Sequence, residues 1–289
     1  MDTNDVQYYN KDSSFYFEYK QIKSNNMRVG HFHDTYEIYY LMSGSRIFFI
    51  KDKMIDVPEN SLIIIHPNVL HRVINAPESD YTRFITYFNM DAFPSFLIND
   101  FTISPFLKND YIVFQFTERE REAANKFVKP MIEEALKKET GYEITLYGLF
   151  LQYLAFCFRC IKKDHPVIPS IKNPTYIRTT EVVKYINEHY NEDLSLDVLA
   201  DKFYVSPFHL CRKFKEVTQF SLSNYINIVR IKEAIIIMNK APKKSIKSIA
   251  KEVGFKSYTN FSRAFKEITG HSPMYYKKNN ISSTTFSII

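Results

Sequence analysis

The first ninety residues alternate short apolar runs with polar turns. Between Phe15 and Asn89, the runs EIYYLMSG, RIFFI, MIDV, SLIII and HRVI have the length and the β-branched or aromatic content of strands. The intervening segments KDK and PEN have the polar and proline residues that are typical of turns. Many short, closely spaced strands predict a β-sandwich or β-barrel for this part of the chain.

From about Glu118 the apolar residues recur at helical spacing. We expect one helix that is kinked by Pro130 and stopped near Gly141. A second helix, from about Tyr142 to Ile161, is apolar on nearly every side, so it must be covered on several sides. A second subunit could provide part of that cover. Residues 118–162 are therefore predicted to be a helical dimerisation segment of a homodimer.

Prolines then interrupt the chain at Pro166, Pro169 and Pro174, which excludes regular helix or sheet interior and indicates a linker over 163–175. Beyond it, helical spacing continues to about Lys278. We therefore predict an α+β chain: a β-domain over 1–117, the helical segment, the linker, and an all-α domain over 176–289.

The all-α part contains an internal repeat. FKEVT at Phe214–Thr218 returns as FKEIT at Phe265–Thr269, and the flanking residues agree as well. In the second copy Gly254 suits a tight corner between two helices, and Ser257 suits the N-cap of the second one. The first copy has Ser206 as N-cap, followed by Pro207. Helix, tight corner and helix form a helix-turn-helix unit, whose second helix can enter a major groove.

Charge is distributed unevenly along the chain, whose formal net charge is +6. Residues 176–289 hold 18 Lys and Arg against 10 Asp and Glu, whereas residues 1–175 hold 20 against 22. A basic module on a near-neutral body favours a polyanionic partner, most often nucleic acid. A merely soluble basic surface remains the alternative on charge alone.

The second helices of the two units have positions that their apolar stripes leave free. Arginine can bridge guanine O6 and N7, and asparagine can pair with adenine, whereas lysine suits phosphate. A solvated helix face is the alternative, but two copies on a basic module favour double-stranded DNA. The candidate DNA-binding residues are Phe208, Cys211, Arg212, Lys215, Tyr258, Thr259, Asn260, Arg263 and Lys266.

Two segments carry a family resemblance. IAKEVGF…YTNFSRAFKEITGHSPMYYKK and DLSLDVLADKFYVSPFHLCRKFKEVT resemble the AraC/XylS transcription regulators over about Ile177 to Lys278. The resemblance implies two helix-turn-helix units joined by one long helix, about Leu222 to Met238, that present their second helices to successive major grooves. It also implies activation of transcription through RNA polymerase. Tyr204 and Gln219 stand where the family often has glycine or a small turn residue, which predicts strain in the first unit.

The β-domain contains a second group of candidate residues. His31, His33 and Glu37 follow the pattern H-x-H-x3-E-x6-G, and His71 lies in a later segment that resembles the second cupin motif. This resemblance, over about Val29 to Asn75, implies a cupin-like jelly-roll barrel; it departs at Asn60, His66 and Asn68. The four residues could line a pocket for a small effector, be structural histidines at a barrel mouth, or bind a divalent transition metal. We expect the effector pocket, with no metal ion and no other cofactor.

Other features restrict the class of protein. The N-terminus lacks the pattern of a secretory signal, and the uncharged stretch Ile144 to Phe158 is too short to span a membrane. Three cysteines fit a reducing cytoplasm, and Cys157 and Cys160 are interpreted as core thiols rather than a metal or redox site. We therefore predict a cytoplasmic regulator, not an enzyme, that responds to a sugar or other small metabolite. A cupin metalloenzyme with a DNA-binding tail and an effector-independent regulator remain the alternatives.

Overall fold

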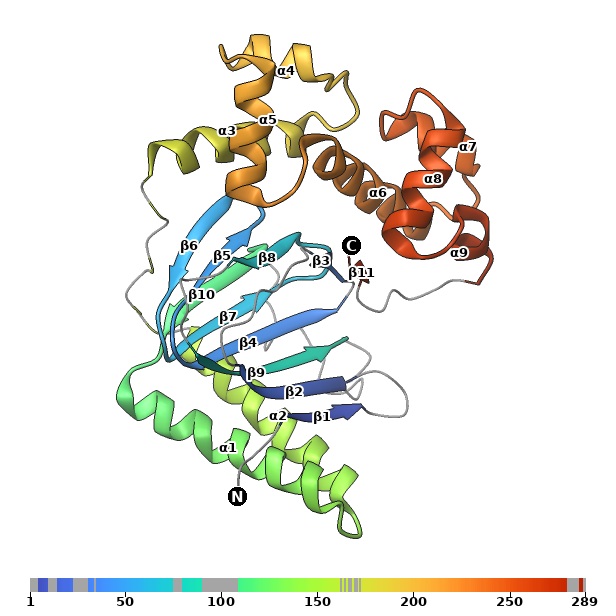
Figure 1. Cartoon of the computed structure of the whole chain (residues 1–289). Coiled ribbons are helices and arrows are strands. Elements are labelled where there is room, and N and C mark those ends of the chain that lie inside the picture. Colours follow the sequence, from blue (N-terminus) through green and yellow to red (C-terminus); the bar gives the residue numbers. More distant parts are fainter. Residues whose placement is uncertain are drawn as a thin grey trace.

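The computed structural model describes residues 5–9, 15–22, 31–33, 35–74, 80–89, 109–161, 163, 165, 168, 171, 173–279 and 286–287. Two bodies make up the fold (Figure 1): curved β-sheets with two helices beneath them, and a helical module above. The predicted combination of an N-terminal, mainly β domain with a C-terminal helical domain is confirmed.

The β-body consists of two antiparallel sheets. The six-stranded sheet has the order β1 (Val6–Tyr9), β2 (Phe15–Ile22), β9 (Tyr81–Phe88), β4 (Tyr36–Ser43), β7 (Ser61–Ile65) and β10 (Tyr111–Gln115). The five-stranded sheet has the order β11 (Phe286–Ser287), β3 (His31–Phe32), β8 (His71–Ile74), β5 (Arg46–Ile50) and β6 (Lys53–Val57). The five runs assigned to strands from the sequence correspond to β4 through β8.

Alternation along β4 shows how the sheets are layered. Ile38 and Tyr40 belong to the core that includes the helices beneath the six-stranded sheet. Tyr39 and Leu41 instead join a core with residues of β5, β6 and β8, between the two sheets. Because both faces of β4 are covered, its buried residues form a continuous run rather than an apolar–polar alternation.

Helices α1 (Glu118–Lys137) and α2 (Tyr142–Ile161) cover the outer face of the six-stranded sheet. Helix α1 continues through Pro130, and its C-cap is Lys138 in the left-handed conformation, so the expected stop at Gly141 is three residues late. Helix α2 has 20 residues and is long and apolar enough to cross a membrane, contrary to the estimate from Ile144 to Phe158. One side of it, including Phe150 and Tyr153, is nevertheless buried in the core against the sheet.

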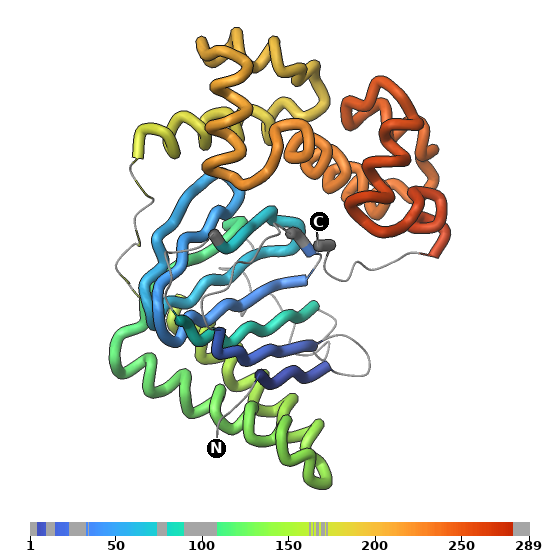
Figure 2. Tube along the Cα trace, viewed as in Figure 1, coloured from blue at the N-terminus to red at the C-terminus, as the bar shows by residue number. Residues whose placement is uncertain are grey.

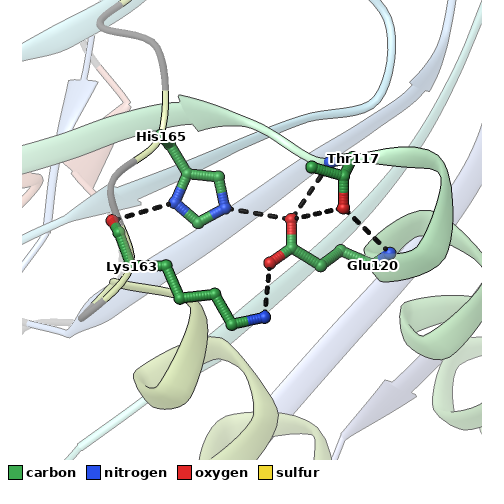
Figure 3. Close-up of polar contacts among 4 residues, drawn as sticks. All are labelled: Thr117, Glu120, Lys163 and His165. Atoms are coloured by element: carbon green, nitrogen blue, oxygen red, sulfur yellow. Dashed lines mark hydrogen bonds and ion pairs between the residues drawn. The ribbon is translucent and has the colours of Figure 1, made fainter.

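Glu120 connects the start of α1 to the chain that follows α2 (Figure 3). Its carboxylate accepts hydrogen bonds from the Thr117 backbone at 3.0 Å and from Lys163 Nζ at 2.7 Å. His165 Nε2 lies 2.9 Å from the same carboxylate. Burial alone would raise the pKa of Glu120, but the hydrogen bonds from Lys163, His165 and Thr117 outweigh it and lower the pKa to about 2.

The helical module contains α3 (Pro174–Glu188), α4 (Leu196–Lys202), α5 (Pro207–Thr218), α6 (Leu222–Lys240), α7 (Ile246–Glu252), α8 (Tyr258–Thr269) and α9 (Pro273–Asn279). Helices α4 and α5 form one helix-turn-helix unit and α7 and α8 the other, with α6 running between them (Figure 1). Ser206 and Ser257 are the N-caps of α5 and α8, and Pro207 begins α5, as the sequence predicts.

The two units differ in the residues at their turns. Gly254 and Gly270 have φ angles of +90° and +75°, and the matching positions of the first unit, Tyr204 and Gln219, have φ angles of +53° and +62°. A side chain in this left-handed region costs roughly 1–2 kcal/mol. At Gly254 a Cβ atom would also lie 2.8 Å from the carbonyl oxygen of Tyr190. Glycine is therefore required at the second corner.

The two bodies are in contact through the outer face of the five-stranded sheet. Phe49, Met54 and Leu70 belong to the same core as the helical module, where the ring of Phe49 lies 6.4 Å from that of Tyr225 on α6. Ile171, in the predicted linker, donates its backbone N–H to the carbonyl of Met54 at 2.8 Å. The linker is thus attached to the sheet at this position.

The C-terminal part of the chain returns to the N-terminal sheet. The trace in Figure 2 shows the helical module on the opposite side of the sheets from the pair α1 and α2. In β11, Phe286 and Ser287 pair with Phe32 and His31 of β3, at the end of the five-stranded sheet (Figure 1). The prediction of an all-α region over 176–289 is therefore wrong at these residues. Two residues are too few to show a strand pattern, and their pairing depends on a partner more than 250 positions away.

Candidate functional site

The candidate DNA-binding residues of α5 lie on its outer side. Leu210, Phe214 and Val217 are buried, whereas Phe208, Arg212 and Lys215 are exposed and Cys211 is partly exposed. The Phe208 side chain is 77% exposed to solvent. The helix therefore presents an arginine, a lysine and an aromatic ring together.

Helix α8 repeats this arrangement. Its buried side is formed by Phe261, Phe265 and Ile268. All five candidates on this helix are exposed: Tyr258, Thr259, Asn260, Arg263 and Lys266.

Asn260 and Arg263 also line a hollow of about 350 Å³ between α8 and α6. Arg230 of α6 lines the same hollow and is held by hydrogen bonds to the carbonyls of Tyr190 at 2.7 Å and Glu192 at 2.8 Å. This half-buried arginine fixes α6 to the loop that follows α3. Its contacts span 38 to 40 residues, so the repeat pattern does not reveal it.

Lysines suited to phosphate differ in their surroundings. Lys213 pairs with Glu216 at 2.9 Å, and Lys256 pairs with Asp193 at 2.9 Å. Among the described residues, Lys215 and Lys266 form no ion pair, and each lies near the end of its helix. These two lysines are the better placed to meet a phosphate backbone.

Three of the four candidate residues in the β-domain form one buried cluster. Glu37 Oε2 lies 2.9 Å from His33 Nε2 and 3.0 Å from His71 Nε2. The side chains of His33, Glu37 and His71 are exposed by 0%, 3% and 1%. His31 pairs with His71 through the backbones of β3 and β8, but its side chain lies outside the described part of the structure.

Strand alternation explains why the cluster is internal. Glu37 alternates with Tyr39 and Leu41 on β4, and His71 alternates with Val73 on β8; these apolar residues all face the core between the sheets. Burial alone would raise the pKa of Glu37, but the charge of His71 and the hydrogen bonds of both histidines hold it well below its usual range. Burial and the nearby Glu37 carboxylate raise the pKa of Tyr87, whose ring packs edge-on against that of His33.

Arg72 is a functional candidate that the sequence pattern did not reveal. Its guanidinium is buried against the helical module, where Nη1 donates to the carbonyl of Gln219 at 3.3 Å and the group lies over the Phe220 ring. Burial lowers the pKa of Arg72. An arginine that follows His71 in a predicted strand must face away from it, and that alternation was the available signal.

Both halves of the chain match known protein families. Residues 20–136 match a family model described as an AraC-like ligand binding domain, and residues 199–279 match one described as a helix-turn-helix domain. The uncharacterized HTH-type transcriptional regulator YdeC of Bacillus subtilis is 22% identical over 258 residues, which cover 86% of each chain.

A second relative from Bacillus subtilis, the uncharacterized HTH-type transcriptional regulator YfiF, is 24% identical over 274 residues. These residues cover 91% of this chain and 83% of YfiF. Among solved structures, a crystal structure of an apo ToxT variant from Vibrio cholerae aligns with a TM-score of 0.40 at 17% identity. That alignment covers 93% of this chain and 98% of ToxT.

Proposed function

The chain belongs to the AraC-type transcription regulators, and we propose that it binds two successive major grooves of double-stranded DNA under the control of a small-molecule effector. It is a regulator rather than an enzyme, because both families and the named relatives are of that class. This sets aside the alternative of a metalloenzyme with a DNA-binding tail.

The observation that carries the proposal is the repeated exposed face of α5 and α8. Each helix buries one apolar stripe and exposes a basic and aromatic set on its other side, with Arg212 in the first and Arg263 in the second. The 19-residue helix α6 lies between the two units. Such a spacer suits two units that read adjacent major grooves on one side of a duplex.

The proposed control by a small-molecule effector depends on the β-domain. We propose that His31, His33, Glu37 and His71 form the polar part of a pocket for a sugar or related metabolite. Buried polar groups that converge within an apolar body are typical of small-molecule sites, which supports this assignment. We further propose a cytoplasmic homodimer, joined through α1 and α2, that activates transcription by contacting RNA polymerase.

The test uses the full-length protein and a labelled duplex from the region upstream of its own gene. We expect binding that weakens steeply as salt rises, since lysine and arginine contacts release counterions from the phosphates. Fluorescence anisotropy of the labelled duplex at several salt concentrations measures the affinity, and a duplex of scrambled sequence is the control. An affinity that changes with neither the salt concentration nor the DNA sequence would contradict the proposal.

The proposed effector binding is tested with a panel of sugars in a thermal-shift assay, because a ligand that binds the folded state raises the Tm of the protein.

A further inference from the structure

Three side chains on the inner face of the six-stranded sheet have buried polar atoms without a hydrogen-bond partner among the described residues. They are Arg83 of β9, Tyr39 of β4 and Ser61 of β7, and each is no more than 5% exposed. The atoms concerned are Nε and Nη1 of Arg83 and the two hydroxyl oxygens, and solvent does not reach them. Buried polar groups are nearly always hydrogen-bonded, so three such side chains together indicate a missing partner.

The strand register brings these side chains together around Leu41. Arg83 and Ser61 are the direct partners of Leu41 on the two neighbouring strands, and Tyr39 lies two residues before it on β4. Residues directly opposite each other on antiparallel strands, and residues two apart on one strand, share a face of the sheet. That face is the one toward the core between the sheets, to which Tyr39 and Leu41 belong. The Arg83 guanidinium lies 5.9 Å from the centre of the Tyr39 ring.

The charge at this position is positive. Arg83 Nη2 donates to one carboxylate oxygen of Glu18, and Lys20 Nζ lies 2.7 Å from the other. One carboxylate therefore faces two cations, which leaves one positive charge in excess among these three side chains. The N–H groups on Nε and Nη1 of Arg83 have no acceptor in the part of the chain that the structure describes.

Tyr39 and Ser61 add hydroxyl groups to the same set. Burial raises the pKa of Tyr39, and the positive charges of Arg83 and Arg46 only act against that shift. The phenol therefore keeps its proton at neutral pH and can donate it, as the serine hydroxyl can. Several N–H and O–H donors beside an uncompensated positive charge are what an anionic group binds most strongly.

We propose that Arg83, Tyr39 and Ser61 bind a carboxylate of the effector, which makes the effector an acidic metabolite such as a sugar acid. This inference rests on the proposed effector binding and names the ligand class for it. A carboxylate brings one negative charge, which equals the excess positive charge at Glu18, Lys20 and Arg83. A phosphate monoester brings about two and would leave a buried negative charge without a partner, whereas a neutral sugar would leave the positive charge uncompensated.

The carboxylate site lies beside the polar residues already proposed for the pocket. On the inner face of β4, Tyr39 follows Glu37 and precedes Leu41. The hydroxyl groups of a sugar acid held by Arg83 can then extend along this strand toward Glu37 and His71. Because the donors have no exposed surface, the ligand is enclosed between the sheets, and the strands that cover the site must move to admit it.

The test compares matched ligands in a thermal-shift assay of the full-length protein. Glucuronate is measured beside glucose and its phosphate, and galacturonate beside galactose and its phosphate. We expect at least one of the two acids to raise the Tm at concentrations at which its neutral and phosphorylated counterparts do not. The inference is overturned if neither acid raises the Tm, or if a neutral sugar or a sugar phosphate raises it as much.

Two variants test the assigned residues. Arg83→Lys keeps a cation beside Glu18 but removes the free N–H groups, so it should weaken binding of the acid by about tenfold or more. Tyr39→Phe should weaken binding by roughly fivefold. Because Tyr39→Phe removes a hydroxyl that has no partner, it should not lower the free energy of unfolding without ligand, as loss of a structural hydrogen bond would. Wild-type affinity for the acid in both variants would also overturn the inference.

The matched control is Tyr40→Phe, which removes the hydroxyl of the next residue on the opposite face of β4. This variant should bind the acid as the wild type does, and circular dichroism shows whether each variant folds. Arg263→Ala should lose DNA affinity and keep the response to the acid. A neutral sugar that raises the Tm when no acid does would support effector binding and overturn only the acidic ligand class, so the two failures are distinguishable.

Discussion

His71 and Arg72, consecutive residues of β8, point to opposite sides of the five-stranded sheet. His71 Nε2 lies 3.0 Å from Glu37 Oε2 between the sheets, and Arg72 Nη1 donates to the Gln219 carbonyl at 3.3 Å in the helical module. Gln219 is the C-cap of α5. A shift of β8 caused by a ligand near His71 would therefore reach the end of α5, one of the two helices proposed to bind DNA, through a single residue.

Replacing Arg72 by alanine should weaken the attachment of the helical module. Loss of a buried, charged hydrogen-bond donor is expected to lower the free energy of unfolding by about 1–3 kcal/mol. Urea denaturation measures the loss, and hydrogen exchange should show less protection at Phe220. Arg212→Ala is the control, because Arg212 is exposed on the same helix α5 and its removal should change stability by no more than about 0.5 kcal/mol. Equal free energies of unfolding for the two variants would contradict a stabilising contact between Arg72 and Gln219.

The two corners should respond to substitution in opposite directions. Tyr204 is 95% exposed and has a φ of +53°, so Tyr204→Gly relieves backbone strain without loss of packing. After the entropy cost of glycine, we expect stabilisation by about 0.5–1 kcal/mol. Gly254→Ala should destabilise by at least about 2 kcal/mol, since it adds the same strain and a clash with Tyr190. Denaturant unfolding of both variants tests this, and destabilisation by Tyr204→Gly would disprove the strain.

Arginine and lysine substitutions should separate base reading from phosphate binding. Arg212→Ala and Arg263→Ala are each expected to cost about 1–3 kcal/mol of binding and to relax specificity at sites about one helical turn apart. Lys266→Ala should weaken binding to all sequences by a smaller and uniform factor. Affinities for a panel of single-base variants of the bound duplex distinguish base reading from phosphate binding. A uniform loss across the panel for both arginine variants would assign them to phosphate.

Leu149 provides a test of the proposed dimer. It is only partly buried on α2, whereas Tyr153 is fully buried within the monomer, so a charge at Leu149 should disrupt the subunit contact without unfolding the chain. We expect Leu149→Asp to sediment as a monomer under conditions in which the wild type is a dimer. Arg178→Asp, at an exposed position of α3 outside the proposed contact, should remain dimeric. A monomeric wild type at high concentration rules the proposal out.

Glu120 should make stability dependent on pH in the acid range. Its pKa is about 2 in the folded chain against 4.5 for an ordinary glutamate, so its contribution is complete above pH 4.5 and is lost as the pH falls toward 2. Because Lys163 is largely exposed to solvent, which screens its charge, the contribution should amount to about 1–2 kcal/mol. Wild type and Glu120→Gln should therefore differ in unfolding free energy at pH 6 and converge near pH 2. A constant difference over that range would show that the carboxylate charge contributes nothing.

The sequence predicted those features that depend only on residues close to one another in the chain. The bounds of α2 and the caps of α5 and α8 follow from apolar spacing and from Ser206, Pro207 and Ser257, all of which act within a few residues. Glu37 and His71 could be proposed as neighbours because a sequence resemblance and strand alternation placed both facing inward.

Contacts between distant segments could not be predicted in this way. Arg72 and Gln219 are 147 residues apart, and Arg230 and Tyr190 are 40 apart; each pair depends on how whole elements pack. The sequence identified no strand at β1, β9 or β10, where the partner strands decide the structure more than local preference does. The 2.8 Å contacts of His33 Nδ1 and His71 Nδ1 likewise depend on the backbone carbonyls of Thr35 and Val69, which a residue pattern does not position.

The pairing of β11 with β3 means that the helical module is fastened to the β-body at both of its ends. Ile171 holds the entering chain to Met54, and Phe286 and Ser287 return the leaving chain to Phe32 and His31. A domain that is attached to its neighbour at one end of its chain can rotate more freely than a domain that is attached at both ends. For the helical module, these two attachments add to the packed contact between Phe49 and Tyr225, so they restrict how the whole module moves against the β-body, and one of them lies on the strand that carries His31.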